Sequence, residues 1–299
     1  MTTGPAASRL PSRALRLGLP AWAFAPWRGP YFPKDAPPLA SYARVFDTVE
    51  GNITFYTLPD GKTVARWCEL LTGRDFRFCF KLPREVTHGG MARERGVLAA
   101  LFDRLEPLGE LCGPFMVQLP ARIGPDELPA LDALLAVLPS GHRFAVEVRN
   151  AALIAAPGHL HDLLARHGCG RVLLDTRPIY GTAPPHPDLE DAVHEKPDLP
   201  VVWDGPECLR IVRFIGHPLL DHDAPFMREW GEQLRAWLAP APVHGAPARE
   251  VHVMLHCPND VHAPRIARAM HATLRSALAG VLDMPPLPDW PVPQLGFGF

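Results

Sequence analysis

The sequence lacks the long apolar segments that mark membrane-spanning and exported proteins. No run of about 18 apolar residues occurs, which argues against a transmembrane helix. The first residues, Met1–Arg16, contain arginines but no apolar core of about 7–15 residues, so no secretory signal peptide is expected. We therefore expect a cytoplasmic protein without a membrane partner.

Paired cysteines and a strong excess of charge are also missing. The six cysteines form no CxxC pair, and several lie within apolar segments, which indicates buried thiols in a reducing compartment. The formal net charge is -2. The surface as a whole therefore gives no signal for nucleic acid or acidic membranes, although a local basic pocket is compatible with this balance.

Common catalytic and cofactor motifs are absent as well. The chain contains no GxSxG, no HExxH and no local Cys/His cluster with zinc spacing, so we predict no metal site of those kinds. A glycine-rich phosphate loop after the first predicted strand is lacking too, which argues against a dinucleotide-binding sheet. The sequence leaves any cofactor unknown.

What the chain does contain is an alternation of strands and helices. Apolar and alternating segments predict eight strands, at Leu15–Leu19, Asp47–Asn52, Phe76–Lys81, Pro114–Leu119, Arg143–Asn150, Arg171–Arg177, Leu209–Gly216 and Glu250–His256. Helical patterns lie between them, which favours an α/β fold with a parallel sheet. Eight units over residues 15–283 predict a single TIM-type (β/α)8 barrel. An open doubly wound sheet is the alternative.

Proline marks the segments outside this alternation. Its 36 residues are concentrated in loops and ends. We expect a flexible tail at 1–14, a Pro-rich tail at 284–299 and a Pro-rich insertion at 178–208. A loop as long as that insertion within a compact domain is usually functional or disordered.

Charged residues interrupt the central predicted strand, Arg143–Asn150. Glu147 and Arg149 share one face of it, because side chains alternate along a strand. Two charges on a buried strand are costly unless they are paired or used. The same alternation predicts polar inward positions at the ends of seven strands: Glu50 and Asn52, Lys81, Gln118, Glu147 and Arg149, Asp175 and Arg177, Arg213, and His256. Barrel active sites are built at that end.

The chemistry of these residues suggests the kind of ligand. Lys81, Arg149, Arg177 and Arg213 suit phosphate or carboxylate oxygens. We expect Asn52 and Gln118 to orient a small anionic, polyhydroxylated or sugar-like molecule. Glu147, Glu50 and Asp175 are the candidate catalytic acids or bases, since a dry carboxylate titrates far from its ordinary pKa.

Several segments together resemble the YecE-like family, a domain of unknown function found widely in bacteria and archaea. The resemblance extends from about Leu15 to Leu278. It is carried by FDTVEGNITFYTLP at 46–59, FRFCFKLPREVTH at 76–88, AVEVR at 145–149, WRGPYFP at 27–33, GPFMVQLP at 113–120, LDTR at 174–177 and RFIGH at 213–217. The family is similar in fold to a TIM-type barrel.

The resemblance implies further site positions without a reaction. Besides the residues named above, it places Tyr56, Arg84 and His88 in family motifs, and it matches the segment His256–Asp260, which contains the ligand-binding candidate Asn259. Two departures stand out. Gly18-Leu-Pro-Ala-Trp22 replaces the usual Gly-Thr-Ser-Gly-Trp, which removes two hydroxyls. Asn150 stands where the family often has histidine.

Three hypotheses follow, and the sequence does not decide whether the protein is an enzyme. The first is an anion-binding protein with acid–base catalysis by Glu147. The second is a metal-dependent hydrolase or isomerase using Glu50, Glu147, Asp175 and His256. The third is a non-catalytic protein that binds phosphate or a nucleic-acid end, with the aromatic segment at 22–32 as a stacking platform. Substrate and oligomeric state stay unknown.

Overall fold

The chain folds into an α/β structure in which each predicted strand is present. The computed structural model describes residues 14–89, 91, 95–206, 208–239 and 250–291. Its strands are β1 Leu15–Gly18, β2 Thr48–Gly51, β3 Arg77–Phe80, β4 Phe115–Gln118, β5 Phe144–Glu147, β6 Gly170–Asp175, β7 Leu209–Ile215 and β8 Glu250–His256. Residues 1–13 of the expected N-terminal tail lie outside the described residues.

The strands pair in parallel in two sheets. The larger sheet has six strands in the order β1-β8-β7-β6-β5-β4, and the smaller one contains β2 and β3. In the larger sheet Arg213 of β7 is in register with Leu174 of β6 and with Met254 of β8. Parallel pairing brings the carboxyl ends of these strands to the same side, which gathers the residues that end them.

The two sheets contact each other at both of their edges. On one side Lys81, just after β3, bridges to Met116 of β4, and Leu82 N–H donates to the Met116 carbonyl at 3.0 Å. On the other side Glu50 N–H donates to the Leu19 carbonyl at 3.0 Å, next to β1. The small sheet therefore connects β1 and β4, the two edge strands of the large sheet.

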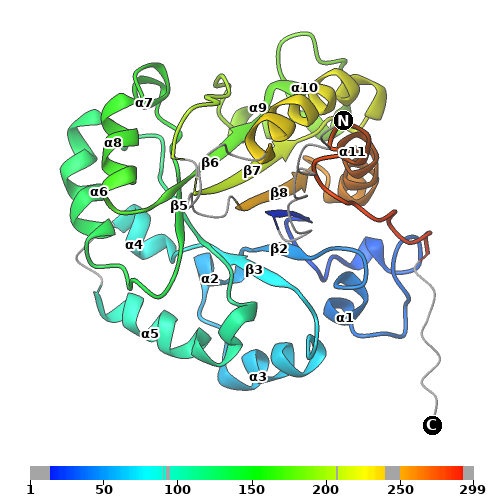
Figure 1. Cartoon of the computed structure of the whole chain (residues 1–299), viewed down its shortest axis with the longest axis horizontal. Helices are drawn as coiled ribbons and strands as arrows, with labels where there is room; N and C mark the ends of the chain where they lie inside the picture. Colours follow the sequence, from blue (N-terminus) through cyan, green and yellow to red (C-terminus); the bar gives the residue numbers. More distant parts are fainter. Residues whose placement is uncertain (1–13, 90, 92–94, 207, 240–249, 292–299) are drawn as a thin grey trace, which may run out of the picture.

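Helices surround the strands, as Figure 1 shows. They are α1 Pro38–Tyr42, α2 Ile53–Tyr56, α3 Gly61–Leu70, α4 Arg84–Gly89, α5 Arg95–Leu105, α6 Leu128–Leu135, α7 Ala151–Ala155, α8 Gly158–Arg166, α9 Ala192–Glu195, α10 Leu220–Leu238 and α11 Ala263–Ala277. None of the helices in the described part of the chain is long and apolar enough to cross a membrane.

The alternation of β3 shows how the sequence selects its two faces. Phe78 and Phe80 are fully buried and stack at 5.1 Å on the side of α3, where Trp67 lies 5.4 Å from Phe78. Cys79 points to the opposite face. There it joins a small apolar cluster, termed the inner cluster, which consists of Cys79, Met116, Ala145, Val172, Leu209, Ile211 and Met254. Side chains from both sheets thus enclose one interior.

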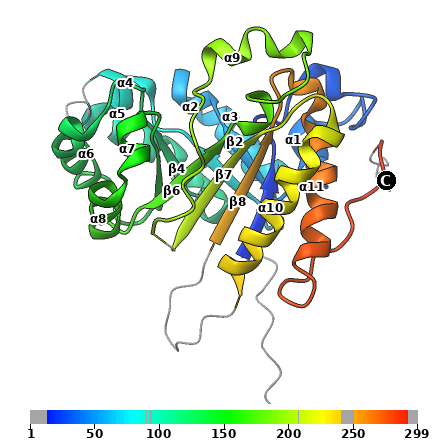
Figure 2. The same cartoon turned by 90° about the horizontal axis from the view of Figure 1, so that it is seen from above.

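The Pro-rich insertion has structure of its own. It begins with a 3-10 helix at Arg177–Ile179 and contains another at Pro187–Leu189, followed by α9. Ile179, Leu189 and Ala192 form a buried cluster with Ile215, the last residue of β7. In Figure 2, α9 lies on the same side of the molecule as α2 and α4, which follow the carboxyl ends of β2 and β3. The insertion therefore packs at the end of the strands where the polar residues gather. Residue 207 lies outside the described residues.

Part of the expected C-terminal tail also packs against the fold. The Trp290 ring lies 4.8 Å from that of Tyr31, and the Arg268 guanidinium lies 4.0 Å above it. The Met284 carbonyl accepts a hydrogen bond from Arg275 at 3.0 Å. Residues 292–299 of this tail lie outside the described residues.

Close contact between β1 and β2 leads to a test of the fold. A Cβ atom at Gly18 would lie 2.2 Å from the Thr48 carbonyl oxygen. Backbone atoms cannot move away cheaply, so we expect Gly18→Ala to lower the free energy of unfolding by about 1–3 kcal/mol. Gly61→Ala, at the start of α3 in open space, should be neutral or stabilising. Urea unfolding of both variants measures the difference, and equal midpoints would refute the close approach.

Candidate functional site

A buried glutamate at the end of β2 forms the centre of the polar residues. Glu50 accepts two hydrogen bonds from the Arg213 guanidinium, at 2.8 Å from Nε and 3.0 Å from Nη2. The Lys81 ammonium lies 2.9 Å from Glu50 Oε1. The paired geometry of Glu50 and Arg213 is the fork-to-fork arrangement that makes arginine–carboxylate pairs strong.

A second glutamate extends this arrangement toward solvent. Glu147 accepts a hydrogen bond from Arg213 Nη1 at 2.9 Å and one from Arg149 Nε at 2.7 Å. His256 Nε2 lies 2.9 Å from Glu50 Oε2. These contacts define the central ion network, which consists of Glu50, Lys81, Glu147, Arg149, Arg213 and His256. The structure thus brings together six of the residues predicted from strand ends.

Burial makes these interactions strong and fixes the charges. Glu50 and Glu147 are fully buried. Burial by itself raises the pKa of Glu147, but Arg213, Arg149 and Lys81 outweigh it and lower that pKa to about 2. In the same way burial is outweighed at Glu50 by the charges of Arg213 and Lys81, and the hydrogen bond with His256 adds to their effect. Together they hold the pKa of Glu50 well below the ordinary value. Both carboxylates are therefore ionised at neutral pH.

The histidine of the network is uncharged at neutral pH. Burial lowers the pKa of His256 to about 4, despite the opposing effect of Glu50. A neutral imidazole beside Glu50 therefore serves as a hydrogen-bond partner and not as a third cation. The positive charge of the network comes from its lysine and its two arginines.

Gln118 lies beside the network with an unused hydrogen-bond acceptor. It is in register with Glu147 across β4 and β5 and is buried. Its Oε1 atom has no hydrogen-bond partner among the residues that the structure describes. An unpartnered buried carbonyl is costly unless a ligand or water supplies a donor, so Gln118 is suited to contact a bound molecule.

The inward orientation predicted for Asp175 and Arg177 is wrong. Asp175 accepts a hydrogen bond from the Trp230 indole at 2.7 Å, and Arg177 donates to Glu229 at 2.8 Å. Both partners belong to α10, outside the sheet. The reason is register: Leu174, and not Asp175, aligns with Arg213. Asp175 and Arg177 pair with each other at 2.9 Å and fasten α10 to β6.

The other predicted ligand-binding residues lie around the network with different roles. The Asn52 amide donates to the Pro20 carbonyl at 3.1 Å, and Asn259 Oδ1 accepts from Val261 N–H at 3.2 Å. Tyr56 and Arg84 line a cavity beside α2 and α4. Asn150, which departs from the family's histidine, caps α7 by accepting from Ala152 N–H at 3.0 Å. The asparagines thus support loops.

Sequence reasoning missed two charged residues at this end of the strands. Lys196 follows α9 in the insertion, and burial together with Arg213 and Arg149 lowers its pKa. Burial raises the pKa of Asp260 to about 6, with Lys196 opposing and Glu50 adding to the rise. Neither ends a strand, so strand alternation gave no signal. The Asp260 carbonyl accepts a hydrogen bond from the Trp27 indole at 2.7 Å. This bond holds the aromatic segment against the fold, where the buried Trp27 ring serves packing.

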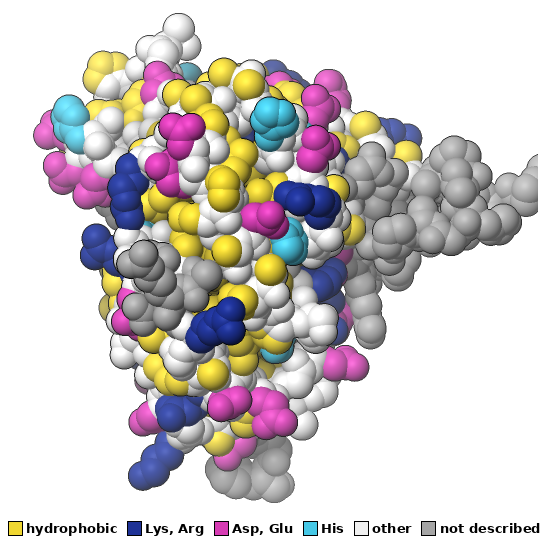
Figure 3. Space-filling view, turned by 90° about the vertical axis from the view of Figure 1, so that its left-hand side faces the viewer, with side chains coloured by type: hydrophobic (Ala, Val, Ile, Leu, Met, Phe, Trp, Pro, Cys, Tyr) yellow, Lys and Arg dark blue, Asp and Glu magenta, His cyan; other side chains and the backbone are white. Residues whose placement is uncertain are grey.

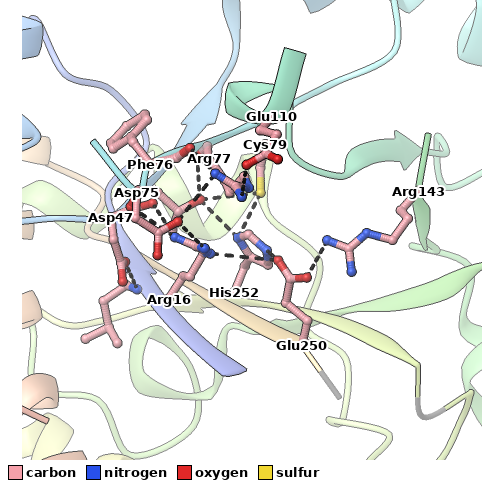
Figure 4. Close-up of polar contacts among 12 residues, drawn as sticks. Arg16, Asp47, Asp75, Phe76, Arg77, Cys79, Glu110, Arg143, Glu250 and His252 are labelled. Carbon is pink, nitrogen blue, oxygen red and sulfur yellow. Dashed lines mark hydrogen bonds and ion pairs between the residues drawn. The ribbon is translucent and has the colours of Figure 1, made fainter. Parts of the chain in front are cut away.

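A second polar cluster lies toward the opposite ends of the strands. Figure 4 shows His252 between Cys79 and Glu250, with distances of 3.2 Å to the Cys79 sulfur and 2.5 Å to Glu250 Oε1. Arg143 also pairs with Glu250. Burial strongly raises the pKa of the Cys79 thiol, which is the opposite of what a nucleophile needs. The cluster is therefore structural, and His252 is a satisfied core histidine.

The residues proposed for a metal do not converge. Glu50 and Glu147 are each paired with cations, and Asp175 contacts α10. Within the described ranges, no group of three or more His, Cys, Asp or Glu residues is arranged to hold a metal ion. The site as built is an ion-paired pocket rich in guanidinium and ammonium groups.

Fold and site define an α/β protein with parallel strands and a buried ion network at their carboxyl ends. Residues 16–291 match the family model described as "Protein of unknown function DUF72". The chain is also 33% identical over 277 residues to the protein named UPF0759 protein YecE of Escherichia coli K12, covering 91% of this chain and 97% of that protein. The chain belongs to the DUF72 family, which confirms the resemblance identified from its motifs.

Solved structures of family members share the fold. A DUF72 family protein from Enterococcus faecalis V583 superimposes with a TM-score of 0.67 at 19% identity, covering 94% of this chain and 99% of that one. One from Thermotoga maritima MSB8 gives a TM-score of 0.64 at 19% identity, covering 89% and 99%. These structural similarities support the fold and do not indicate a reaction.

The low pKa of Glu147 leads to a pH-dependent prediction. Because its pKa is about 2 in the folded chain and ordinarily 4.5, its ionisation stabilises the fold fully above about pH 4.5, and this contribution is lost as the pH falls through about 2. Glu147→Gln should lower the free energy of unfolding by about 3–5 kcal/mol at pH 7, since it leaves buried charge unpaired. The difference should shrink between about pH 4.5 and pH 2.

Urea unfolding at several pH values measures this difference. Glu69→Gln is the matched control, because Glu69 is 65% exposed and pairs with Arg66 on the surface of α3. It should cost little at any pH. A Glu147→Gln difference that stays constant down to pH 2.5 would rule out the pairing described.

Proposed function

We propose that the protein binds a small anionic molecule at the carboxyl ends of its strands. The observation that carries the proposal is the excess of cations in the network. Within the network three cations accompany two carboxylates: Lys81, Arg149 and Arg213 with Glu50 and Glu147. A bound phosphate or carboxylate balances the remaining positive charge.

Two groups of the site support a hydroxylated anion in particular. The Arg149 side chain is 24% exposed, whereas that of Glu147 is fully buried. Glu147 accepts a hydrogen bond from the Nε atom of Arg149 alone. The Arg149 guanidinium therefore has further N–H groups that can donate to a ligand. The unpartnered Oε1 atom of Gln118 accepts a hydroxyl donor. Together these groups suit a phosphorylated or carboxylated molecule that also carries hydroxyls.

The proposal includes the inference that the eight strands close into a (β/α)8 barrel. Hydrogen bonds from Leu82 to Met116 and from Glu50 to Leu19 support it, because they join the edges of the two sheets. The inner cluster, which draws side chains from both sheets, supports it as well. In such a barrel the central ion network would occupy the end at which barrel active sites are built.

The charge distribution favours a small ligand over a long nucleic acid. On the face shown in Figure 3, basic side chains are interspersed with acidic and hydrophobic ones. The net charge of the chain is -2. Proteins that track a nucleic-acid backbone use continuous basic surfaces, and a net negative charge gives no support for one.

Binding of inorganic phosphate tests the proposal. Arg149→Gln should weaken phosphate binding to the full chain by about 10–100-fold, because a charge-assisted hydrogen bond is worth about 1.5–3 kcal/mol. Isothermal titration calorimetry at low ionic strength measures the affinity. Arg66→Gln is the control, since Arg66 lies on the exposed surface of α3 with Glu69 as its partner. The proposal fails if the wild-type chain shows no saturable binding of phosphate, pyrophosphate or citrate.

Asp260 is the group best suited to transfer a proton on such a ligand. Its pKa of about 6 lies near neutral pH, where general acid–base catalysis is most effective. Glu147, with a pKa of about 2, stays ionised and is held by two arginines. We therefore propose that Glu147 and Glu50 position cations, and that any acid–base step is carried by Asp260.

The same pKa makes anion affinity depend on pH. As the pH falls from about 7.5 to about 5, Asp260 takes up a proton and the site loses a negative charge. Sulfate, whose own charge is constant in this range, should then bind roughly three- to tenfold more tightly. Asp260→Asn should remove this part of the pH dependence. Sulfate titrations of both chains at the two pH values measure it, and an unchanged profile in the variant would exclude Asp260.

A further inference from the structure

A cavity of about 690 Å³ opens beside the central ion network. It lies between α2, α4 and α5, next to the carboxyl ends of β2 and β3. Its lining includes Phe55, Tyr56, Leu58, Arg84, His88 and Leu101. This volume is in the range of small-molecule sites, which are commonly apolar with a few polar groups.

Aromatic rings form one wall of this cavity. The Phe55 ring lies 5.1 Å from Tyr56 and 5.4 Å from His88, both edge-to-face. Tyr56 is 78% exposed, which is unusual for so large a side chain. Its ring therefore offers a face to a ligand, whereas Phe55 is buried and holds it in place.

Cations surround the aromatic wall and connect it to the network. Arg122 donates a hydrogen bond to the His88 carbonyl. Burial, together with the charges of Arg84, Arg122 and Arg149, lowers the pKa of His88. The Lys81 ammonium lies 5.7 Å from the centre of the Phe55 ring. Lys81 is a member of the network and Phe55 lines the cavity, so the cavity adjoins the proposed anion site.

Among the charged groups that line the cavity itself, the two signs balance. Arg84 and Glu85 are both exposed on the first turn of α4. The excess of positive charge thus lies on the side of the network, where Arg149 and Lys81 are. A ligand with an apolar ring in the cavity and an acidic group toward the network matches this gradient.

We propose that the ligand is an aromatic anion, a flat ring bearing a phosphate or carboxylate group. The ring occupies the cavity against Tyr56 and Leu58, and the acidic group contacts Arg149. This inference rests on the proposed function and specifies its ligand class. An aromatic ring is favoured over an aliphatic chain, because the exposed face of Tyr56 gains by stacking as well as by burial.

Two probes of equal charge separate the ring from the anion. Methyl phosphate and phenyl phosphate are titrated into the full-length chain at pH 7.5 by calorimetry. Phenyl phosphate should bind at least tenfold more tightly. Tyr56→Ala should reduce this preference about 5–100-fold, since stacking of a flat ring on an aromatic side chain is worth about 1–3 kcal/mol. Methyl phosphate affinity should not change. Tyr56→Phe should retain the preference.

Leu219→Ala is the matched control, since Leu219 is a 46%-exposed apolar residue at the start of α10. It should leave both affinities unchanged. Equal binding of the two probes to the wild-type chain would overturn the aromatic class and leave the anion site intact. A preference that survives in Tyr56→Ala would also overturn it. Binding of neither probe would overturn both proposals.

Discussion

The pairing of Glu50 with Arg213 is the interaction on which the arrangement of the strand ends depends. Both groups are charged and buried, and each would be costly in the interior without the other. Two hydrogen bonds at 2.8 Å and 3.0 Å fix their relative orientation. Since Glu50 comes from the small sheet and Arg213 from the large one, the pair also fixes how the two sheets meet.

The remaining members of the network follow from this pair. Arg213 has one more nitrogen for Glu147, and Glu147 in turn holds Arg149. A continuous chain of ion pairs thus runs from the buried Glu50 to the partly exposed guanidinium of Arg149. The buried carboxylates cannot gain or lose protons near neutral pH, which leaves them as scaffolding. The side chains that can bind a ligand are those of Arg149, Gln118 and Lys196, around the network.

Strand alternation predicted most of the network and failed where register intervened. It correctly placed Glu50, Lys81, Glu147, Arg213 and His256 on the inward face, because each strand alternates in a regular way from its apolar core residues. It failed for β6, where Val172 joins the inner cluster and Asp175 therefore faces α10. The charged residues of β6, Arg171 and Asp175, lie on the face that turns toward helices α8 and α10. Polarity therefore did not mark the inward face of this strand.

The sequence by itself determined the strands, their alternation with helices and the family, because those depend on local patterns and on motifs near in the chain. Only the tertiary structure brought Lys196 and Asp260 to the site, since neither lies on a predicted strand and local patterns do not specify the course of the segments that carry them. It alone placed Tyr56 and Arg84 on a separate cavity beside the network. The pKa values of Glu147 and His256 likewise depend on burial and on charges from distant strands, which no local pattern contains.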